Sequence, residues 1–333
     1  MMKKISILLI FLFVAVIANA QKKQNVYYLK NNGQEVALKD SADFIRIVQE
    51  PDSGEKNYVL QEFYTNGQKK TIGKLSAFEP NLVYEGVVVR FNNIGKKIES
   101  VTYEKGEKKG MAFYFFDNGV IKKQVDYLGD SLNKKSTVSN VEGIIADRNN
   151  KLIYQIDSLG KVYVKDGTGH LIETSKIADD ELTEEGDYKD GFKEGVWKGS
   201  YNSGKSSYEE TYQLNKLISG TNTTDGKTYT YTMILVAPQF KGGINQFYKY
   251  IGNAIRYPKD AVISNVTGKV VLSFVIQKDG NITDILVIKS VHPSVDAEAI
   301  RVIKASPKWI PALERGLPVK IKYTIPIKFS LGR

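Results

Sequence analysis

VKIKYTIPIKF, residues 319–329, alternates apolar and polar side chains at a period of two. That period places successive side chains on opposite faces of an extended chain, so the run predicts a β-strand with one buried face. The buried face would hold Val319, Ile321, Tyr323, Ile325, Ile327 and Phe329. On the other face Pro326 has no N–H to donate and three lysines discourage random pairing, which is typical of a sheet edge. We therefore expect an edge strand close to the C-terminus.

The residues before this strand predict a helix followed by a hairpin. Apolar side chains recur at a helical spacing between residues 244 and 255, and Tyr257-Pro258 ends the pattern. A strand is then expected over residues 268–276. The Lys-Asp-Gly-Asn turn at 278–281 returns the chain through a partner strand at 282–289.

A second helix is expected to begin at Pro293 and to end before Pro307. We place Asp296 and Glu298 in its first turn, where carboxylates favour the positive end of the helix dipole. Two positions apart on a helix, these carboxylates point to different faces, which argues against acid–base work. Residues 238–333 are therefore expected to form an α+β domain, with two helices packed on a small antiparallel sheet.

Residues 60–235 are rich in tyrosine and glycine and break at pairs such as Asn66-Gly67 and Asp190-Gly191. This pattern predicts an all-β region of successive hairpins. Such repeats cannot bury a face alone, so each one stacks on its neighbours. Residues 21–59 lack the pattern, but residues 42–48 still predict a strand, and we expect an N-terminal β segment there.

Residues 1–20 have the features of a signal peptide. Lys3 and Lys4 precede an apolar run, and Ala18-Asn19-Ala20 gives a small-x-small cleavage pattern before Gln21. The alternative is an uncleaved anchor, although residues 5–20 would span only about 24 Å as a helix, short of the ~30 Å hydrocarbon core of a bilayer. We expect the remainder of the chain in the periplasm, either free or facing it from an inner-membrane anchor.

Composition argues against several kinds of site. Forty-seven basic and 37 acidic side chains give a net charge of +10, with the lysines spread along the chain rather than clustered as in a nucleic-acid site. The chain has no cysteine, and His170 and His292 lie far apart without a second ligand at metal spacing. We therefore expect no enzyme activity, no catalytic residue, no metal, no cofactor and no nucleic-acid partner.

The repeat region and the C-terminal region each resemble a known family. The repeats, such as Phe63-Tyr64-Thr65-Asn66-Gly67 and Tyr188-Lys189-Asp190-Gly191, resemble the MORN-type repeats of bacterial YwqK-like proteins. Residues 238–333 resemble the TonB C-terminal domain. The matching motifs are Phe240-x-Gly242-Gly243, Tyr257-Pro258, Phe274-Val275 with Asp279-Gly280, Pro307-Lys308-Trp309-x-Pro311, and Gly316-x-Pro318-Val319.

The TonB resemblance implies a two-layer α/β unit that binds a short extended segment of an outer-membrane receptor. The segment adds a strand to an exposed sheet edge, so that backbone hydrogen bonds give affinity. The implied partner-binding residues are Tyr257, Pro258, Lys320, Lys322, Thr324 and Lys328. For Tyr257 the alternative is a core aromatic residue that ends a helix. The expected partner is an envelope protein, with a TonB-dependent outer-membrane receptor as the candidate.

Three functions stay open at this point. The first is a non-enzymatic periplasmic adaptor that binds an envelope protein by strand addition. The second is a membrane-anchored TonB energy transducer driving receptor transport, although residues 1–20 contain no histidine and no proline-rich rod separates Pro80 from Pro238. The third is a structural protein whose repeats contact lipid or glycan at a membrane or cell wall. The oligomeric state is not set by the sequence.

Overall fold

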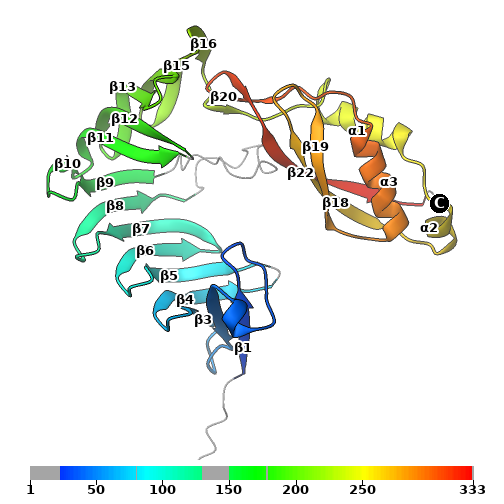
Figure 1. Ribbon diagram of the computed structural model, residues 1–333, viewed down its shortest axis with the longest axis horizontal. Coiled ribbons are helices and arrows are strands. Elements are labelled where there is room, and N and C mark those ends of the chain that lie inside the picture. Colours follow the sequence, from blue (N-terminus) through cyan, green and yellow to red (C-terminus); the bar gives the residue numbers. More distant parts are fainter. Residues whose placement is uncertain (1–22, 80, 130–149, 178, 332–333) are drawn as a thin grey trace, which may run out of the picture. The chain divides into compact units, whose positions relative to one another are not determined.

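A computed structural model describes residues 23–79, 81–129, 150–177 and 179–331 of the chain (Figure 1). Contacts between residues divide the chain into two compact units, 1–107 and 108–333. The predicted signal peptide lies outside the described residues.

The first unit is an antiparallel meander in which each strand pairs with the next. Its elements are β1 (Gln24–Leu29), the 3-10 helix η1 (Lys39–Ser41), β2 (Phe44–Gln49), β3 (Tyr58–Tyr64), β4 (Lys69–Ala77), β5 (Val83–Phe91) and β6 (Lys97–Glu104). Val48, Leu60 and Leu75 are buried together on one face. The boundary expected at residue 60 falls inside β3, which pairs with β2 along six positions.

The second unit opens with a further meander of ten strands. They are β7 (Glu107–Phe115), β8 (Ile121–Tyr127), β9 (Asn150–Ile156), β10 (Val162–Lys165), β11 (Thr168–Ile177), β12 (Asp180–Lys189), β13 (Phe192–Tyr201), β14 (Ser206–Gln213), β15 (Lys216–Thr224) and β16 (Lys227–Tyr231). Asp190 and Gly191 join β12 to β13 with φ of 52° and 85°, which the tight primed turn of a hairpin requires.

Three glycines explain why tyrosine and glycine recur together in this region. Gly186, Gly199 and Gly220 lie under the rings of Trp197, Tyr208 and Tyr231. A Cβ at these glycines would meet ring atoms at 2.3, 2.1 and 2.4 Å respectively. Each aromatic ring thus packs on bare backbone of the preceding strand, because no other residue leaves room for it.

The rest of the second unit is an α+β domain. Its elements are β17 (Leu235–Val236), α1 (Gly243–Ala254), α2 (Lys259–Ile263), β18 (Gly268–Ile276), β19 (Ile282–Lys289), α3 (Pro293–Lys304), β20 (Ala312–Glu314), β21 (Leu317–Val319) and β22 (Ile321–Phe329). The strands form two sheets of three, ordered β19-β18-β22 and β17-β20-β21. The short helix α2 and the second sheet were not expected from the sequence.

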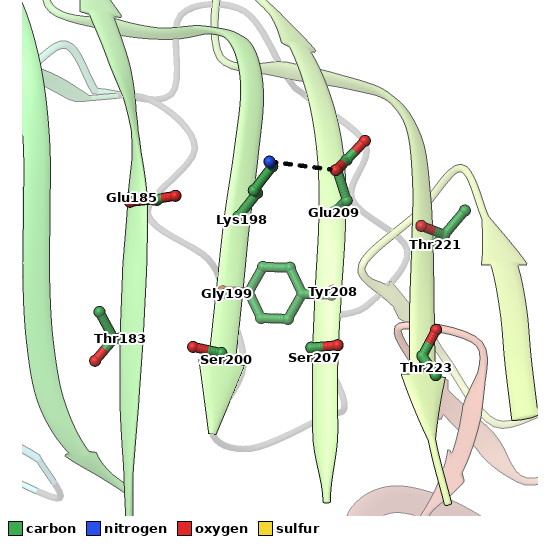
Figure 2. Close-up of a pocket in the computed structure, with 10 residues that line it drawn as sticks. All are labelled: Thr183, Glu185, Lys198, Gly199, Ser200, Ser207, Tyr208, Glu209, Thr221 and Thr223. Carbon is green, nitrogen blue, oxygen red and sulfur yellow. Dashed lines mark ion pairs between the residues drawn. The ribbon is translucent and has the colours of Figure 1, made fainter. Parts of the chain in front are cut away.

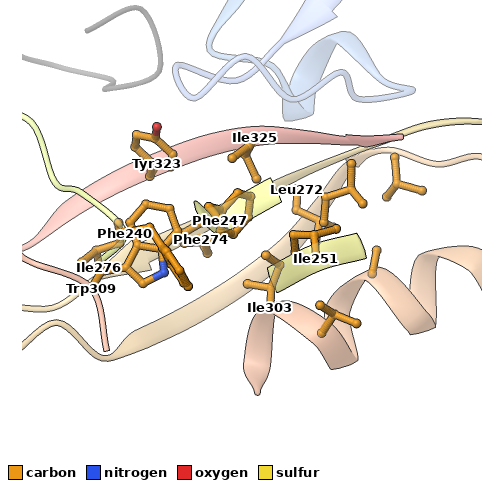
Figure 3. Close-up of a cluster of buried hydrophobic side chains, with 14 of the residues drawn as sticks. Phe240, Phe247, Ile251, Leu272, Phe274, Ile276, Ile303, Trp309, Tyr323 and Ile325 are labelled. Carbon is orange, nitrogen blue, oxygen red and sulfur yellow. The ribbon is translucent and has the colours of Figure 1, made fainter. Parts of the chain in front are cut away.

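Trp309 lies at the aromatic end of this domain's core, close to Phe240, Phe274 and Tyr323 (Figure 3). Its ring centroid is 5.6 Å from Phe240, 5.3 Å from Phe247 and 5.5 Å from Tyr323. The indole Nε1 donates to Ser306 Oγ at 3.1 Å, so its polar group is satisfied within the core. Phe274 of β18 lies edge-on to the same ring, with centroids 5.9 Å apart, and buried side chains of α3 belong to the same core.

The prediction that Asp296 and Glu298 share the first turn of α3 was wrong for Glu298. The helix begins at Pro293, which leaves Asp296 in the first turn and Glu298 in the second. Asp296 accepts hydrogen bonds from Ser290 Oγ at 2.5 Å and from the Val291 N–H at 3.1 Å, and so fixes the loop that enters the helix.

Candidate partner-binding edge

Strand β22 forms one edge of the sheet, as the sequence predicts. It pairs with β18 at nine positions, from Gly268 opposite Phe329 to Ile276 opposite Ile321. Within the residues that the structure describes, no strand pairs with its other side. The backbone of that side is therefore available for pairing.

The two faces of β22 follow the predicted alternation. Ile321, Tyr323, Ile325, Ile327 and Phe329 are buried. On the opposite face Lys322, Pro326 and Lys328 are exposed and Thr324 is half-buried, while Lys320 is exposed just before the strand. Sequence alternation thus reports the burial of this strand residue by residue.

Pro326 also indicates which backbone groups face the free edge. A proline in an edge strand takes a position whose N–H would point away from the neighbouring strand. In an antiparallel pair, residues two apart present their backbone groups in the same direction. Lys322, Thr324 and Lys328 are in phase with Pro326, so we expect their N–H and C=O groups to point outward.

Tyr257 supports β22 from the core side, and Pro258 lies at the start of α2. The Tyr257 hydroxyl donates to the Val266 carbonyl, and its half-buried ring lies edge-on to Phe329 with centroids 5.7 Å apart. Pro258 precedes α2, and its carbonyl accepts the Val262 N–H at 3.0 Å. Phe329 belongs to the buried face, so Tyr257 lies on the other side of the sheet from the lysines. Its contacts match the core-aromatic alternative.

The end of α1 is fixed to α3 by a pair of charged side chains. Glu298 accepts from Arg301 Nε at 2.7 Å and from the Arg256 N–H at 2.5 Å. Arg301 also donates to the Ala254 carbonyl at 2.7 Å, where a cation complements the negative end of α1. The hydrogen bond from Arg301 lowers the pKa of Glu298, which therefore stays ionised. This carboxylate is structural.

Sequence reasoning missed a buried contact made by the turn between β20 and β21. Arg315, at the tip of this turn, donates from Nε to Glu210 Oε1 at 2.9 Å and lies over the Tyr208 ring at 3.8 Å. The Glu210 side chain is fully buried and also accepts from the hydroxyls of Tyr212 and Tyr231, at 2.9 and 2.7 Å. The turn therefore inserts a cation into the aromatic face of the repeat sheet.

This buried cluster is internally satisfied. Burial opposes the charge on Arg315, but Tyr208, Glu210 and Tyr231 outweigh it and raise the pKa of the guanidinium. Burial and the neighbouring Glu184 raise the pKa of Tyr208, which keeps its proton. The cluster therefore links the β20–β21 turn to β14 through a buried ion pair and two tyrosine hydrogen bonds.

The opposite face of these repeat strands is polar and open (Figure 2). Thr183, Ser200, Ser207 and Thr223 stand in one row, because they are successive cross-strand partners. Lys198 and Glu209 form an exposed ion pair of 3.9 Å in the next row. Hydroxyls and a solvated ion pair do not make a catalytic arrangement.

Neither histidine belongs to a metal cluster in the described part of the chain. His170 Nδ1 lies 2.7 Å from Asp187 Oδ1 on the sheet surface, and His292 Nδ1 lies 2.9 Å from Ser294 Oγ. Over the same residues, no helix combines the length and apolar character needed to span a bilayer.

Comparison with known proteins concerns the C-terminal part of the chain. The family described as Gram-negative bacterial TonB protein C-terminal matches residues 253–331. Protein TonB from two strains of Helicobacter pylori is 38% and 37% identical over 95 residues, which cover 27% of this chain and 32% of each relative. The chain thus spans about a third of the length of these curated relatives.

Two solved structures match the same part. They are NMR solution structures of the H. pylori TonB C-terminal domain, 31% and 32% identical. The matches cover 26% and 28% of this chain and 90% and 87% of those chains, with TM-scores of 0.22 and 0.21.

Proposed function

Because residues 253–331 form a TonB C-terminal domain, we propose that this chain is a non-enzymatic cell-envelope protein that binds an extended segment of an envelope protein. The segment adds to the free side of β22 as a further strand. A TonB-dependent outer-membrane receptor is the candidate partner. The observation that carries the proposal is a nine-residue edge strand, paired on one side only among the described residues of such a domain.

The edge favours an extended segment that carries acidic side chains. Lys320, Lys322 and Lys328 line it, and β22 itself contains no carboxylate. Complementary charge raises the association rate and selects the partner, while backbone hydrogen bonds supply most of the affinity. Association should therefore slow as salt is added, because exposed charges are screened.

Thr324 allows backbone pairing to be separated from side-chain contacts. Thr324→Pro removes the N–H that we expect to face the free edge, whereas Thr324→Val retains it and changes only the side chain. The loss of one backbone hydrogen bond costs about 1 kcal/mol, and the residue at the centre of the edge should show at least this effect. We expect Thr324→Pro to weaken peptide binding by roughly tenfold and Thr324→Val to leave it within twofold.

The measurement is calorimetric titration of the full chain with a peptide that carries the TonB box of a receptor from the same organism. Near-ultraviolet circular dichroism of both variants checks that the core around Trp309 is intact. Equal affinities for Thr324→Pro and wild type, with the fold retained, would exclude strand addition at β22.

An inner-membrane energy transducer is the second candidate, since the matching relatives are both Protein TonB. The N-terminal residue and the cell fraction of the native protein separate the two. A chain that begins near Gln21 and is released with the soluble periplasm supports the adaptor. A chain that begins at Met1 or Met2 and stays in the inner membrane supports the transducer.

A further inference from the structure

The outward face of the sheet β19-β18-β22 carries two bare aliphatic side chains among lysines. Leu286 and Ile288 of β19 are each 58% exposed. Lys269, Lys289 and Lys328 are exposed around them. We call these five residues the lysine face. Most of them lie on β18 and β19, away from the free side of β22.

The register brings like charges together on this face. Lys269 is directly opposite Lys328, and Lys289 is opposite Val271, the next outward residue of β18. Like charges that face each other across strands destabilise a sheet. Among the described residues, the ion pairs of this domain are made by His292, Arg301, Lys308 and Arg315, and by none of these three lysines.

Carboxylates are almost missing from the same sheet. Its three strands contain one, Asp284, which accepts a hydrogen bond from Thr283 Oγ1 at 3.0 Å. Asp284 lies toward the start of β19, whereas Lys289 ends the strand. No carboxylate of the sheet therefore lies near enough to offset the repulsion among the lysines. An external anion would reduce this repulsion.

We propose that the lysine face docks on the surface of an anionic phospholipid bilayer. Leu286 and Ile288 would enter the boundary between headgroups and acyl chains, while the ammonium groups remain among the phosphates. A second copy of this chain fits less well, because it would bring two sets of lysines together. An acidic peptide would pair with the lysines, but its charged side chains would not bury Leu286 and Ile288.

Docking of this kind is weak and reversible, since it uses three cations and two side chains. Each lysine near an anionic surface increases the partition coefficient by roughly fivefold. Added salt reduces this effect because it screens the charges. The inference can be tested apart from strand addition, because Lys269 and Lys289 belong to β18 and β19, whereas Lys328 also lines the β22 edge and is left unchanged.

The test is sedimentation of the full chain with vesicles of phosphatidylethanolamine and phosphatidylglycerol, against vesicles of phosphatidylcholine alone. The charge variant is Lys269→Gln/Lys289→Gln, and its matched control is Lys216→Gln/Lys227→Gln, which changes two exposed lysines of the repeats. We expect the charge variant to lower the partition coefficient on anionic vesicles by about twentyfold and the control to change it less than twofold.

The apolar side chains need their own pair of variants. Leu286→Asn/Ile288→Asn should also reduce partitioning at least fivefold, whereas Leu214→Asn/Ile218→Asn, at exposed apolar positions of the repeats, should not. Circular dichroism checks the fold of each. Equal losses in variant and control would overturn the proposal, as would binding to polyglutamate but not to anionic vesicles. The affinity of the same variants for the TonB-box peptide should stay unchanged. This measurement distinguishes a failure of membrane docking from a failure of strand addition at β22.

Discussion

Gly280 shows how a single residue holds the C-terminal core in place. It has a φ of 82°, and a Cβ there would lie 2.0 Å from the Trp309 carbonyl oxygen. The Trp309 backbone N–H donates to the Gly280 carbonyl at 2.9 Å, so the turn after β18 is bound to the main chain of Trp309. Only glycine supplies both the left-handed conformation and the close approach.

Gly280→Ala should therefore destabilise the domain strongly. Strain at a positive φ and displacement of the Trp309 backbone each cost about 1–3 kcal/mol. The matched control is Gly252→Ala on α1, where a Cβ meets nothing within 4 Å, and which should be neutral or stabilising by up to ~1 kcal/mol. Urea unfolding followed by tryptophan fluorescence measures both. Similar midpoints for the two variants would contradict this account.

Residues of this kind are partly predictable from sequence. The Asp279-Gly280 pair after an alternating apolar run predicts a turn, and the structure has one there. The contact with Trp309 is not predictable, because it depends on where a loop nearly thirty residues later returns. The same limit applies to Tyr257, whose support of Phe329 arises only once β22 has paired with β18.

At the scale of elements, the β20–β21 hairpin is fixed by its tip. Arg315 reaches Glu210, whose side chain has no exposed surface, and Leu235 of β17 pairs with Glu314, the residue directly before the turn. Removing one partner of a buried ion pair leaves the other charge unpaired, at a cost of about 3–5 kcal/mol. Replacing both partners with apolar residues can be nearly neutral.

Arg315→Met should thus loosen the hairpin, and Arg315→Met/Glu210→Met should recover only part of the loss, because the Tyr212 and Tyr231 hydroxyls then lose their acceptor. Hydrogen exchange of the amides of residues 312–319 measures local opening, and we expect Arg315→Met to speed it by about a hundredfold or more. Lys198→Met is the control, because its ion pair with Glu209 is exposed and worth ~1 kcal/mol or less (Figure 2). Unchanged exchange in Arg315→Met would show that the buried pair does not hold the hairpin.

Sequence periodicity identifies most elements of the C-terminal domain but not this contact. Strands β18 and β22 and helices α1 and α3 follow from apolar spacing, since each buries one face, whereas β19 follows from the turn at residues 278–281. Arg315 stands 105 residues from Glu210, and a lone arginine in a tight turn usually faces solvent. A buried glutamate on a strand is equally hard to predict before its partners are known.

At the scale of the whole molecule, the core of the C-terminal domain is formed by residues of that domain alone. Every buried member of the cluster around Trp309 lies between Leu235 and Phe329. The free side of β22 and its lysines also come from this segment alone. The repeats contribute the surroundings of Arg315, but no residue of the proposed edge.

A chain that begins at Met233 should consequently fold and bind the TonB-box peptide with an affinity within about twofold of the full chain, because backbone pairing at β22 supplies the binding energy. In the short chain the Arg315 side chain would be exposed to water, because the repeat strands that bury it are absent. The loss of Glu210 therefore leaves no unpaired charge in the protein interior. Calorimetric titration of both chains measures the affinities, and Thr324→Pro in the short chain shows whether β22 is still the site. If the short chain keeps the near-ultraviolet dichroism of its packed aromatic residues and yet loses the peptide, the repeats must form part of the binding surface.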